Sequence, residues 1–287
     1  MKLRPAAWTF RQSWTKNLLL CPERGRRSVF DPDWQDHPGD AVTLGTALHE
    51  YAEMRLRGWA HHEAAHHASE WLDGQIESQA FQFVQIKTAK TMHATLDRVV
   101  DRYRSVIDRL LTQYGLPPAH EIERSFDVPL SPDGSIRLEG TWDVRWPAHR
   151  VIGDHKTAAR LDRYVDWEVQ RWYVQPTFYC VAADLVDLVD ACGGDEERAL
   201  EAYWADIGFK PTTFEFYVVD KSTNPDTKTS PAERNHRHGY WLLEQLEAVV
   251  NTYEKMGPEG PWLKNDQHAL CSAKWCPAWD DCKGKHL

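Results

Sequence analysis

Apolar residues change their spacing twice along this chain, and the order of the resulting patterns limits the folds that it can adopt. Over the first third they recur every three or four positions, the period of one helix face. Short segments with alternating or β-branched apolar residues follow, separated by the turn signals Pro132-Asp133-Gly134 and Pro147. The helical spacing then returns on both sides of one more strand-like segment. These patterns predict helices over 44–72, 89–114, 166–189 and 232–256, and strands over 122–130, 136–146, 149–153 and 213–219.

The predicted order is a helical region, three consecutive antiparallel strands, and then a helix, a strand and a helix. This order predicts an α/β fold. With 287 residues, of which 42% are hydrophobic, the chain is long enough for one large domain with its own core. We therefore expect a single domain over residues 1–287. It would comprise a helical region with one cysteine at 1–118, core strands and a helix at 119–220, and a loop, a helix and a cysteine-bearing tail at 221–287. The polar segment 220–235 is expected to be a mobile loop.

Composition and charge narrow the class of protein. The sequence has no run of about 18 apolar residues, and its start lacks the apolar stretch and cleavage site of a signal peptide. We expect a soluble, cytoplasmic protein without a membrane partner. The net charge of −9 argues against a basic surface for nonspecific duplex binding. Basic residues are still dense near the start, where a local groove for nucleic acid and a solvated charged face both remain open: Lys2, Arg4, Arg11, Lys16, Arg24, Arg26 and Arg27.

Two carboxylates and one lysine lie at corresponding places in two successive predicted strands. Asp143 ends the sequence Gly140-Thr-Trp-Asp143 in one strand, and Asp154-His-Lys156 ends the next. A hairpin would bring all three side chains to one region of the sheet. Two carboxylates can hold Mg²⁺ or Mn²⁺ with open positions for water and phosphate, and an ammonium group can position the water. The arrangement suits hydrolysis of a phosphodiester bond.

Five short motifs, taken in order, resemble those of the PD-(D/E)XK nuclease superfamily. The resemblance is to its RecB-like branch, which includes CRISPR-associated iron-sulfur exonucleases and recombination nucleases. One motif alone could arise by chance, but five in the expected order could not easily do so. Glu121 competes with Glu123 for the strand glutamate, and Pro176 inside the last motif indicates a helix start or a kink at Gln175. The motifs are Gly45 to His49, Glu123 to Phe126, Gly140 to Asp143, Asp154 to Lys156, and Gln175 to Tyr179.

The resemblance implies a fold, an activity and a role for each matched residue. It implies a nuclease core with a mixed central sheet flanked by helices, and a Mg²⁺- or Mn²⁺-dependent DNA exonuclease rather than an endonuclease. The substrate would be single-stranded or free-ended DNA in recombination, repair or replication, with a helicase or recombination partner, because the chain has no Walker motif. The implied metal ligands are His49, Asp143 and Asp154, with Glu123 as a contributor; Lys156 would position water, and Gln175 and Tyr179 would position DNA.

Four of the six cysteines are placed to hold a metal centre that joins the two ends of the chain. Cys21 precedes Pro22, and the tail carries Cys271, Cys276 and Cys282. Four thiolates suit either a 4Fe-4S cluster or tetrahedral Zn²⁺. The resemblance implies the cluster, although the first tail gap is four residues here and two in the family pattern. We interpret the remaining two, Cys180 and Cys192, as small buried apolar residues.

Two other functions compete with the nuclease. The first is a noncatalytic DNA-binding or adaptor subunit of a recombination or CRISPR adaptation complex. The intact set of two aspartates and a lysine argues against this function. The second is a zinc metallopeptidase, because His62, Glu63 and His66 form a literal His-Glu-x-x-His sequence. The longer metzincin pattern fails, since Ser69 and Leu72 replace its glycine and histidine. We interpret this stretch as a polar, solvated helix face.

Overall fold

The structure is a computed structural model of the whole chain, and parts of it are described here. The described residues are 2–4, 7–31, 39–78, 81, 83, 86, 88–205, 210–265 and, in the tail, 271, 276, 278, 279, 281 and 282.

A mixed seven-stranded sheet forms the centre of the described structure, in the order β1-β2-β4-β5-β6-β7, with β3 paired to β4 off this path. The expected meander is confirmed, because β3, β4 and β5 pair antiparallel in succession. β2 pairs parallel with β4, and β5 pairs parallel with β6. The strands are β1 (Lys2–Arg4), β2 (Ala7–Arg11), β3 (Ile122–Pro129), β4 (Ile136–Trp146), β5 (Val151–Ala158), β6 (Thr212–Asp220) and β7 (Thr227–Arg234).

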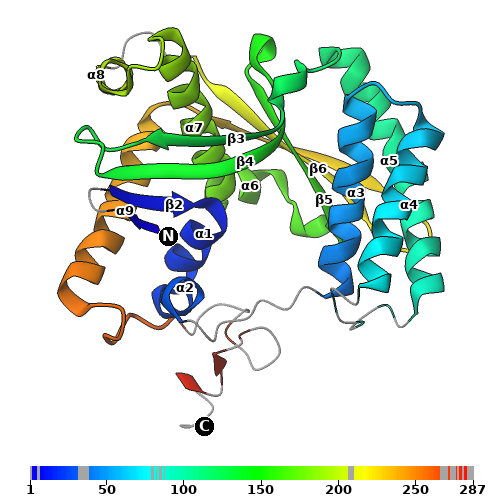
Figure 1. Cartoon of the computed structure of the whole chain (residues 1–287), viewed down its shortest axis with the longest axis horizontal. Coiled ribbons are helices and arrows are strands. Elements are labelled where there is room, and N and C mark those ends of the chain that lie inside the picture. Colours follow the sequence, from blue (N-terminus) through cyan, green and yellow to red (C-terminus); the bar gives the residue numbers. More distant parts are fainter. Residues whose placement is uncertain are drawn as a thin grey trace.

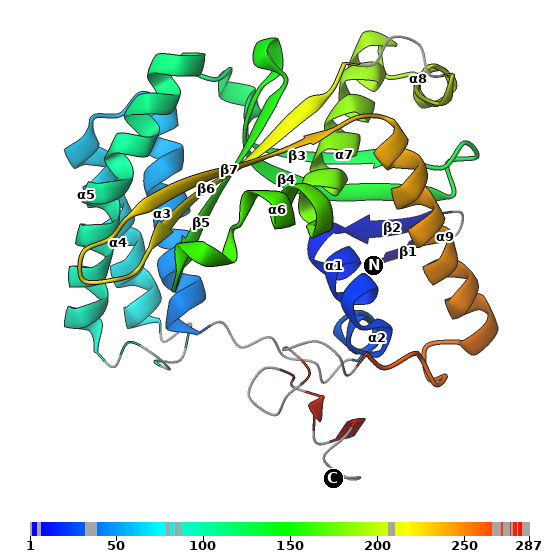
Figure 2. The ribbon, with the colours of Figure 1, turned by 180° about the vertical axis from the view of Figure 1, so that it is seen from behind.

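Helices cover both faces of the sheet and enclose two separate cores (Figures 1 and 2). The alternation along β6 separates them: Phe214 and Phe216 pack with α1 and α6–α9, whereas Tyr217 packs with α3–α5. The helices are α1 (Gln12–Leu20), α2 (Pro22–Phe30), α3 (Asp40–Leu56), α4 (His61–Glu77), α5 (Ala89–Tyr114), α6 (Asp166–Trp172), α7 (Val174–Ala191), α8 (Glu196–Trp204) and α9 (Arg237–Met256).

Local chemistry explains the helix boundaries, including two that the sequence pattern missed. α5 begins where the Thr88 hydroxyl accepts a hydrogen bond from the Thr91 N–H, and it ends at Gly115, whose φ is +75°. The single helix expected over 44–72 is wrong. It is two helices, α3 and α4, because the chain turns at Gly58 with a φ of +92°. The helix expected over 166–189 is likewise divided, at Tyr173, into α6 and α7.

The polar segment 220–235, expected to be a mobile loop, contains a strand instead. Residues 227–234 form β7, which pairs antiparallel with β6 along its whole length, so α9 begins at Arg237 and not at 232. β7 contains Pro231, which has no N–H to donate, and an edge strand tolerates such a residue. The start of the chain is not wholly helical either, since β1 and β2 extend the sheet before α1.

No helix in the described part of the chain is both long and apolar enough to cross a membrane.

Candidate active site

Pairing of β4 with β5 brings the acidic residues of the two predicted motifs together. Val144 of β4 lies opposite Gly153 of β5, so Asp143 and Asp154 occupy neighbouring positions where the two strands meet. β5 runs to Ala158, five residues beyond its predicted end, and the whole Asp154-His-Lys sequence therefore lies within the strand. The sequence prediction that a hairpin gathers these side chains is confirmed.

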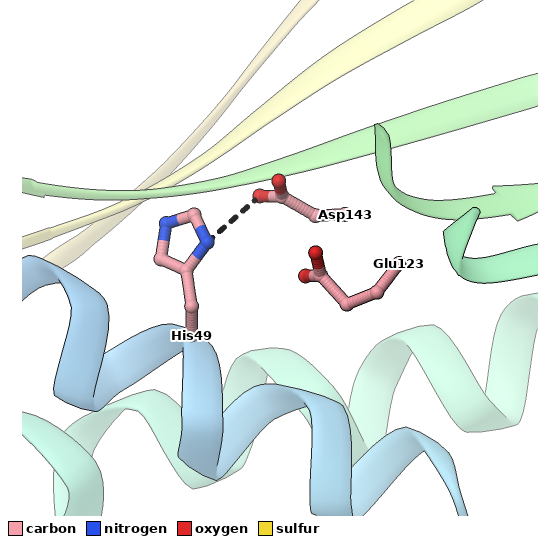
Figure 3. A group of neighbouring side chains, drawn as sticks. All are labelled: His49, Glu123 and Asp143. Atoms are coloured by element: carbon pink, nitrogen blue, oxygen red, sulfur yellow. Dashed lines mark ion pairs between the residues drawn. The ribbon is translucent and has the colours of Figure 1, made fainter. Parts of the chain in front are cut away.

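Three side chains from three elements form the densest group of potential metal ligands among the described residues. One ligand atom each from His49 of α3, Glu123 of β3 and Asp143 of β4 lies within 4.8 Å of the other two (Figure 3). His49 Nδ1 is 3.4 Å from Asp143 Oδ2. An imidazole and two carboxylates are a common donor set for a divalent transition metal, and the carboxylates also suit Mg²⁺.

Main-chain groups of residue 155 orient two members of this group. The His155 N–H donates to Asp143 Oδ2 at 2.7 Å, and the His155 carbonyl oxygen lies 2.6 Å from His49 Nε2. Because a carbonyl oxygen can only accept, His49 Nε2 carries a proton and directs the other ring nitrogen, Nδ1, to Asp143. Nδ1 and the Asp143 carboxylate thus face each other at 3.4 Å, an arrangement that a bound cation would bridge.

Asp154 stands apart from this group of three and is held by other side chains. Lys156 Nζ lies 2.6 Å from Asp154 Oδ2, and Gln175 Nε2 donates to Asp154 Oδ1 at 2.6 Å. Burial, opposed by Lys156 and reinforced by the charge of Asp143, raises the pKa of Asp154 to about 6. Burial also disfavours the charge of Lys156, but Asp154 and Asp143 outweigh it and leave the pKa of Lys156 above its usual value.

The backbone at Glu123 is unusual and directs its carboxylate to the site. Glu123 has a φ of +51°, rare for a residue other than glycine. Ile122 before it packs in the core beneath α3–α5, whereas Phe126 packs in the opposite core, so the strand changes face here. The competing Glu121 is buried in an ion pair with Arg124 at 2.7 Å. The geometry thus favours Glu123 over Glu121 as the strand glutamate.

The carboxylates of the group differ in their proton affinity. Burial and the charge of Asp143, with smaller contributions from Glu53 and Glu50, raise the pKa of Glu123 to about 8. Burial also favours protonated Asp143, but His49, Lys156 and the N–H of His155 together hold its pKa below the usual value. In the metal-free protein one carboxyl is thus mostly neutral at pH 7 and its neighbour is ionised.

Sequence reasoning missed a buried support behind the site. The His155 side chain, on the face opposite Asp154, has its Nδ1 2.6 Å from the hydroxyl of Tyr103, which also lies 3.2 Å from the carbonyl oxygen of Tyr217. Burial lowers the pKa of His155 to about 3, so its ring is neutral. Tyr103 lies within the predicted helix 89–114, and only the fold reveals its polar contact.

The two residues expected to position DNA lie on the same face of α7. Gln175 is in the first turn of this helix, as Pro176 indicated, and its amide reaches Asp154. Tyr179 is one turn further on, where its ring stacks on Phe214 with centroids 5.9 Å apart. It also lines an open groove with Gly140 and Thr141 of β4. The helix therefore joins the metal-binding region to a polar groove beside it.

The four cysteines expected to bind a metal centre line a single cavity. Cys21, at the junction of α1 and α2, shares this cavity with Cys271, Cys276 and Cys282. No three of these sulfurs, all of which are described, lie within 4.8 Å of one another. Arg24 also lines the cavity, and its Nε and Nη1 are buried with no hydrogen-bond partner in the described structure. Of the other two thiols, Cys180 is buried in α7 and Cys192 is partly exposed.

The His-Glu-x-x-His sequence lies on α4, away from these groups. Glu63 accepts a hydrogen bond from the Ala60 N–H at 2.9 Å and so caps its own helix. His66 pairs with Glu70 on the exposed face at 3.4 Å. Within the described residues these histidines gather no third ligand, which a zinc peptidase would need. The structure therefore favours a solvated helix face here.

The fold and the site define an α/β protein with a candidate divalent-metal centre at the junction of α3, β3 and β4. No family model and no curated protein matches the sequence. Among solved structures, the fold is similar to that of a protein from Eubacterium rectale described as a "putative exonuclease". The TM-score is 0.52 with 13% sequence identity, over 91% of this chain and 86% of that one. This likeness shows the fold alone and confirms the expected α/β class.

Proposed function

We propose that the protein is a metal-dependent deoxyribonuclease of the RecB-like type, acting as an exonuclease on single-stranded or free-ended DNA. One observation carries the proposal: His49, Glu123 and Asp143 converge within 4.8 Å beside the Asp154–Lys156 ion pair. The fold likeness to a protein described as an exonuclease agrees with it. Recombination and repair, with a helicase as partner, are the processes such an activity would serve.

Each residue of the site has a chemical task in this proposal. His49, Glu123 and Asp143 would hold Mg²⁺ or Mn²⁺, with Asp154 at the edge of the site. The ion would supply positive charge to the attacked phosphate and acidify its bound water. The Lys156 ammonium, fixed by Asp154, orients the attacking water and stabilises developing charge on the phosphate oxygens. Gln175 orients the other oxygen of Asp154.

The first test measures degradation of end-labelled single- and double-stranded DNA with Mg²⁺ or Mn²⁺, using anaerobically purified protein. Asp154→Asn and Lys156→Met are expected to lower the rate by roughly 10²- to 10⁴-fold. Glu254→Gln and Lys255→Met, exposed on α9, are the matched controls and should cleave as the wild type does. A folded wild type that binds single-stranded DNA but cleaves neither substrate would instead support the noncatalytic adaptor.

We also propose that Cys21, Cys271, Cys276 and Cys282 hold a 4Fe-4S cluster. In a tetrahedral zinc site the four sulfurs would lie about 4 Å apart. In a 4Fe-4S cluster each thiolate binds a different iron, so the sulfurs lie farther apart than in a zinc site. Two nitrogens of Arg24 have no hydrogen-bond partner among the described residues, and they suit the negative charge of four thiolates and a cluster. The cluster would be structural, because hydrolysis transfers no electrons.

Iron, sulfide and zinc analysis of anaerobically purified protein tests the cluster, together with its visible absorbance. We expect roughly four irons per chain in the wild type, and loss of iron when any cavity cysteine is changed to serine. Cys192→Ser is the matched control, because this thiol is similarly exposed but lies outside the cavity. Stoichiometric zinc without iron would show that the alternative metal occupies the site.

A further inference from the structure

A recess beside the metal-binding residues has an unusual charge for a protein of net charge −9. It lies between the first turns of α3 and the end of β5, and none of its lining residues is acidic. Its cationic groups are Lys156 and Lys221, and the imidazole of His49 forms the wall shared with the metal site. Threonines 46 and 157 supply hydroxyl groups. A concave surface with two ammonium groups and hydroxyls is suited to an anion.

Lys221 is the member of this recess that has no task in the catalytic site. It follows β6 directly, where its N–H donates to the carbonyl oxygen of Ala158 at 3.0 Å, so its main chain is anchored to β5. Within the described residues its ammonium makes no ion pair, and the Thr157 hydroxyl makes no hydrogen bond. These unused donors lie one residue beyond Lys156 and one beyond the end of the neighbouring strand.

The acidic group whose charge acts on Lys221 is Asp40, which is also engaged by main-chain groups. Asp40, at the start of α3, is buried and accepts hydrogen bonds from the main-chain N–H groups of Ala41, at 2.8 Å, and Ile86. Desolvation lowers the pKa of Lys221, and the charge of Asp40 raises it only in part. An ammonium in this situation gains from an anion that enters the recess.

An exposed apolar side chain at the rim restricts the kind of anion. Val42 lines the same recess, and 60% of its surface is exposed. A free inorganic ion would gain nothing from it, whereas a nucleotide could place its sugar on the valine and its phosphate on the lysine. The recess shares His49 and Lys156 with the catalytic site, so a phosphate bound in the recess would adjoin one bound at the metal.

We propose that Lys221 and Thr157 bind a DNA phosphate that adjoins the scissile phosphate, and that Lys221 is thus a positioning residue for the strand being cut. This inference rests on the proposed nuclease function and adds a second phosphate contact to it. The contact holds the strand in register, so that the next phosphodiester bond lies at the metal-binding residues. Because it acts on the ground state and the transition state alike, it contributes to substrate binding more than to the chemical step.

The test combines a lysine variant with a change in the substrate. Lys221→Met is compared with wild type, Lys221→Arg and the control Lys255→Met, on single-stranded oligonucleotides carrying one neutral methylphosphonate at successive positions around a defined cleavage site. In wild type, neutralising the phosphate next to the scissile one should raise KM by about 5- to 20-fold with kcat within about twofold. Lys221→Met should show this increase on unmodified DNA and no further increase on the modified strand.

Binding without added divalent metal provides a readout that does not depend on cleavage. The slope of log K against log salt for single-stranded DNA should be smaller by about 0.7 in Lys221→Met, as expected for one lost phosphate contact. Lys221→Arg should keep the slope, and Lys255→Met should not change it. An unchanged slope, or equal methylphosphonate penalties in Lys221→Met and wild type, would overturn the inference. A wild type that neither binds nor cleaves DNA would instead overturn the proposed function.

Discussion

Proton release on metal binding gives a quantitative test of Glu123 as a ligand. In the metal-free protein Glu123 has a pKa of about 8, and Asp154 a pKa of about 6. A carboxylate must lose its proton to bind a metal. At pH 7 Glu123 is roughly nine-tenths protonated and Asp154 roughly one-tenth, so binding of Mn²⁺ should release about one proton per ion. At pH 9 the release should fall to about 0.1 proton.

The same titration fixes the pH dependence of affinity and stability. Because the folded-state pKa of Glu123 lies above its ordinary value of 4.5, stability of the metal-free protein is lost as the pH rises from 4.5 to about 8. A metal ion bound to ionised Glu123 would offset this loss of stability. The apparent affinity for Mn²⁺ should therefore rise by about tenfold per pH unit near pH 7 and level off above pH 8.

Isothermal titration calorimetry in two buffers of different ionisation enthalpy measures the released protons directly. Glu123→Gln should bind Mn²⁺ more weakly and release only about 0.1 proton at pH 7. Glu53→Gln removes one of the charges that raise the pKa of Glu123, so it should release fewer protons and bind more tightly at pH 7. A release below about 0.2 proton in wild type, unchanged in Glu123→Gln, would refute Glu123 as a metal ligand.

Three further substitutions test the supports of the site. Gln175→Leu removes a hydrogen bond to ionised Asp154; it should cost about 1.5–3 kcal/mol in urea unfolding and lower nuclease activity. Tyr103→Phe leaves His155 Nδ1 buried without a partner, and the free energy of unfolding should fall by about 1–3 kcal/mol. Gly153→Ala would place a methyl group against a tyrosine ring of β6, and overpacking should cost about 1–3 kcal/mol. No change in unfolding for any of these variants would contradict the packing described for it.

The sequence was sufficient to predict the strand pair that carries the acidic residues, because the meander has strong alternation and clear turn signals. It did not predict β7, whose residues are polar and include Pro231; an edge strand needs only one partner and little apolar surface. Lys221 was missed for the same reason, since it lay in the presumed loop. The proposed role of Lys221 depends on the pairing of β6 with β5, which no local sequence pattern predicts.

The candidate metal ligands, too, were predicted from the sequence only in part. His49 and Asp143 were predicted as ligands from short motifs, and the structure brings them together. Glu123, expected as a contributor, joins them, whereas the carboxylate of Asp154, expected as a third ligand, contacts Lys156 and Gln175. The positive φ of Glu123 is a backbone feature that has no sequence signature when the residue is not glycine.

The contacts made by the backbone of residue 155 have a consequence for how this site can vary. Its N–H and its carbonyl, not its imidazole, align Asp143 and His49. Every amino acid except proline offers the same two groups, so the ligands stay aligned whatever side chain stands between Asp154 and Lys156. That side chain is free to change with the core beneath it, with Tyr103 as its counterpart. At residue 155 the main chain therefore aligns the metal ligands, and the side chain packs in the core.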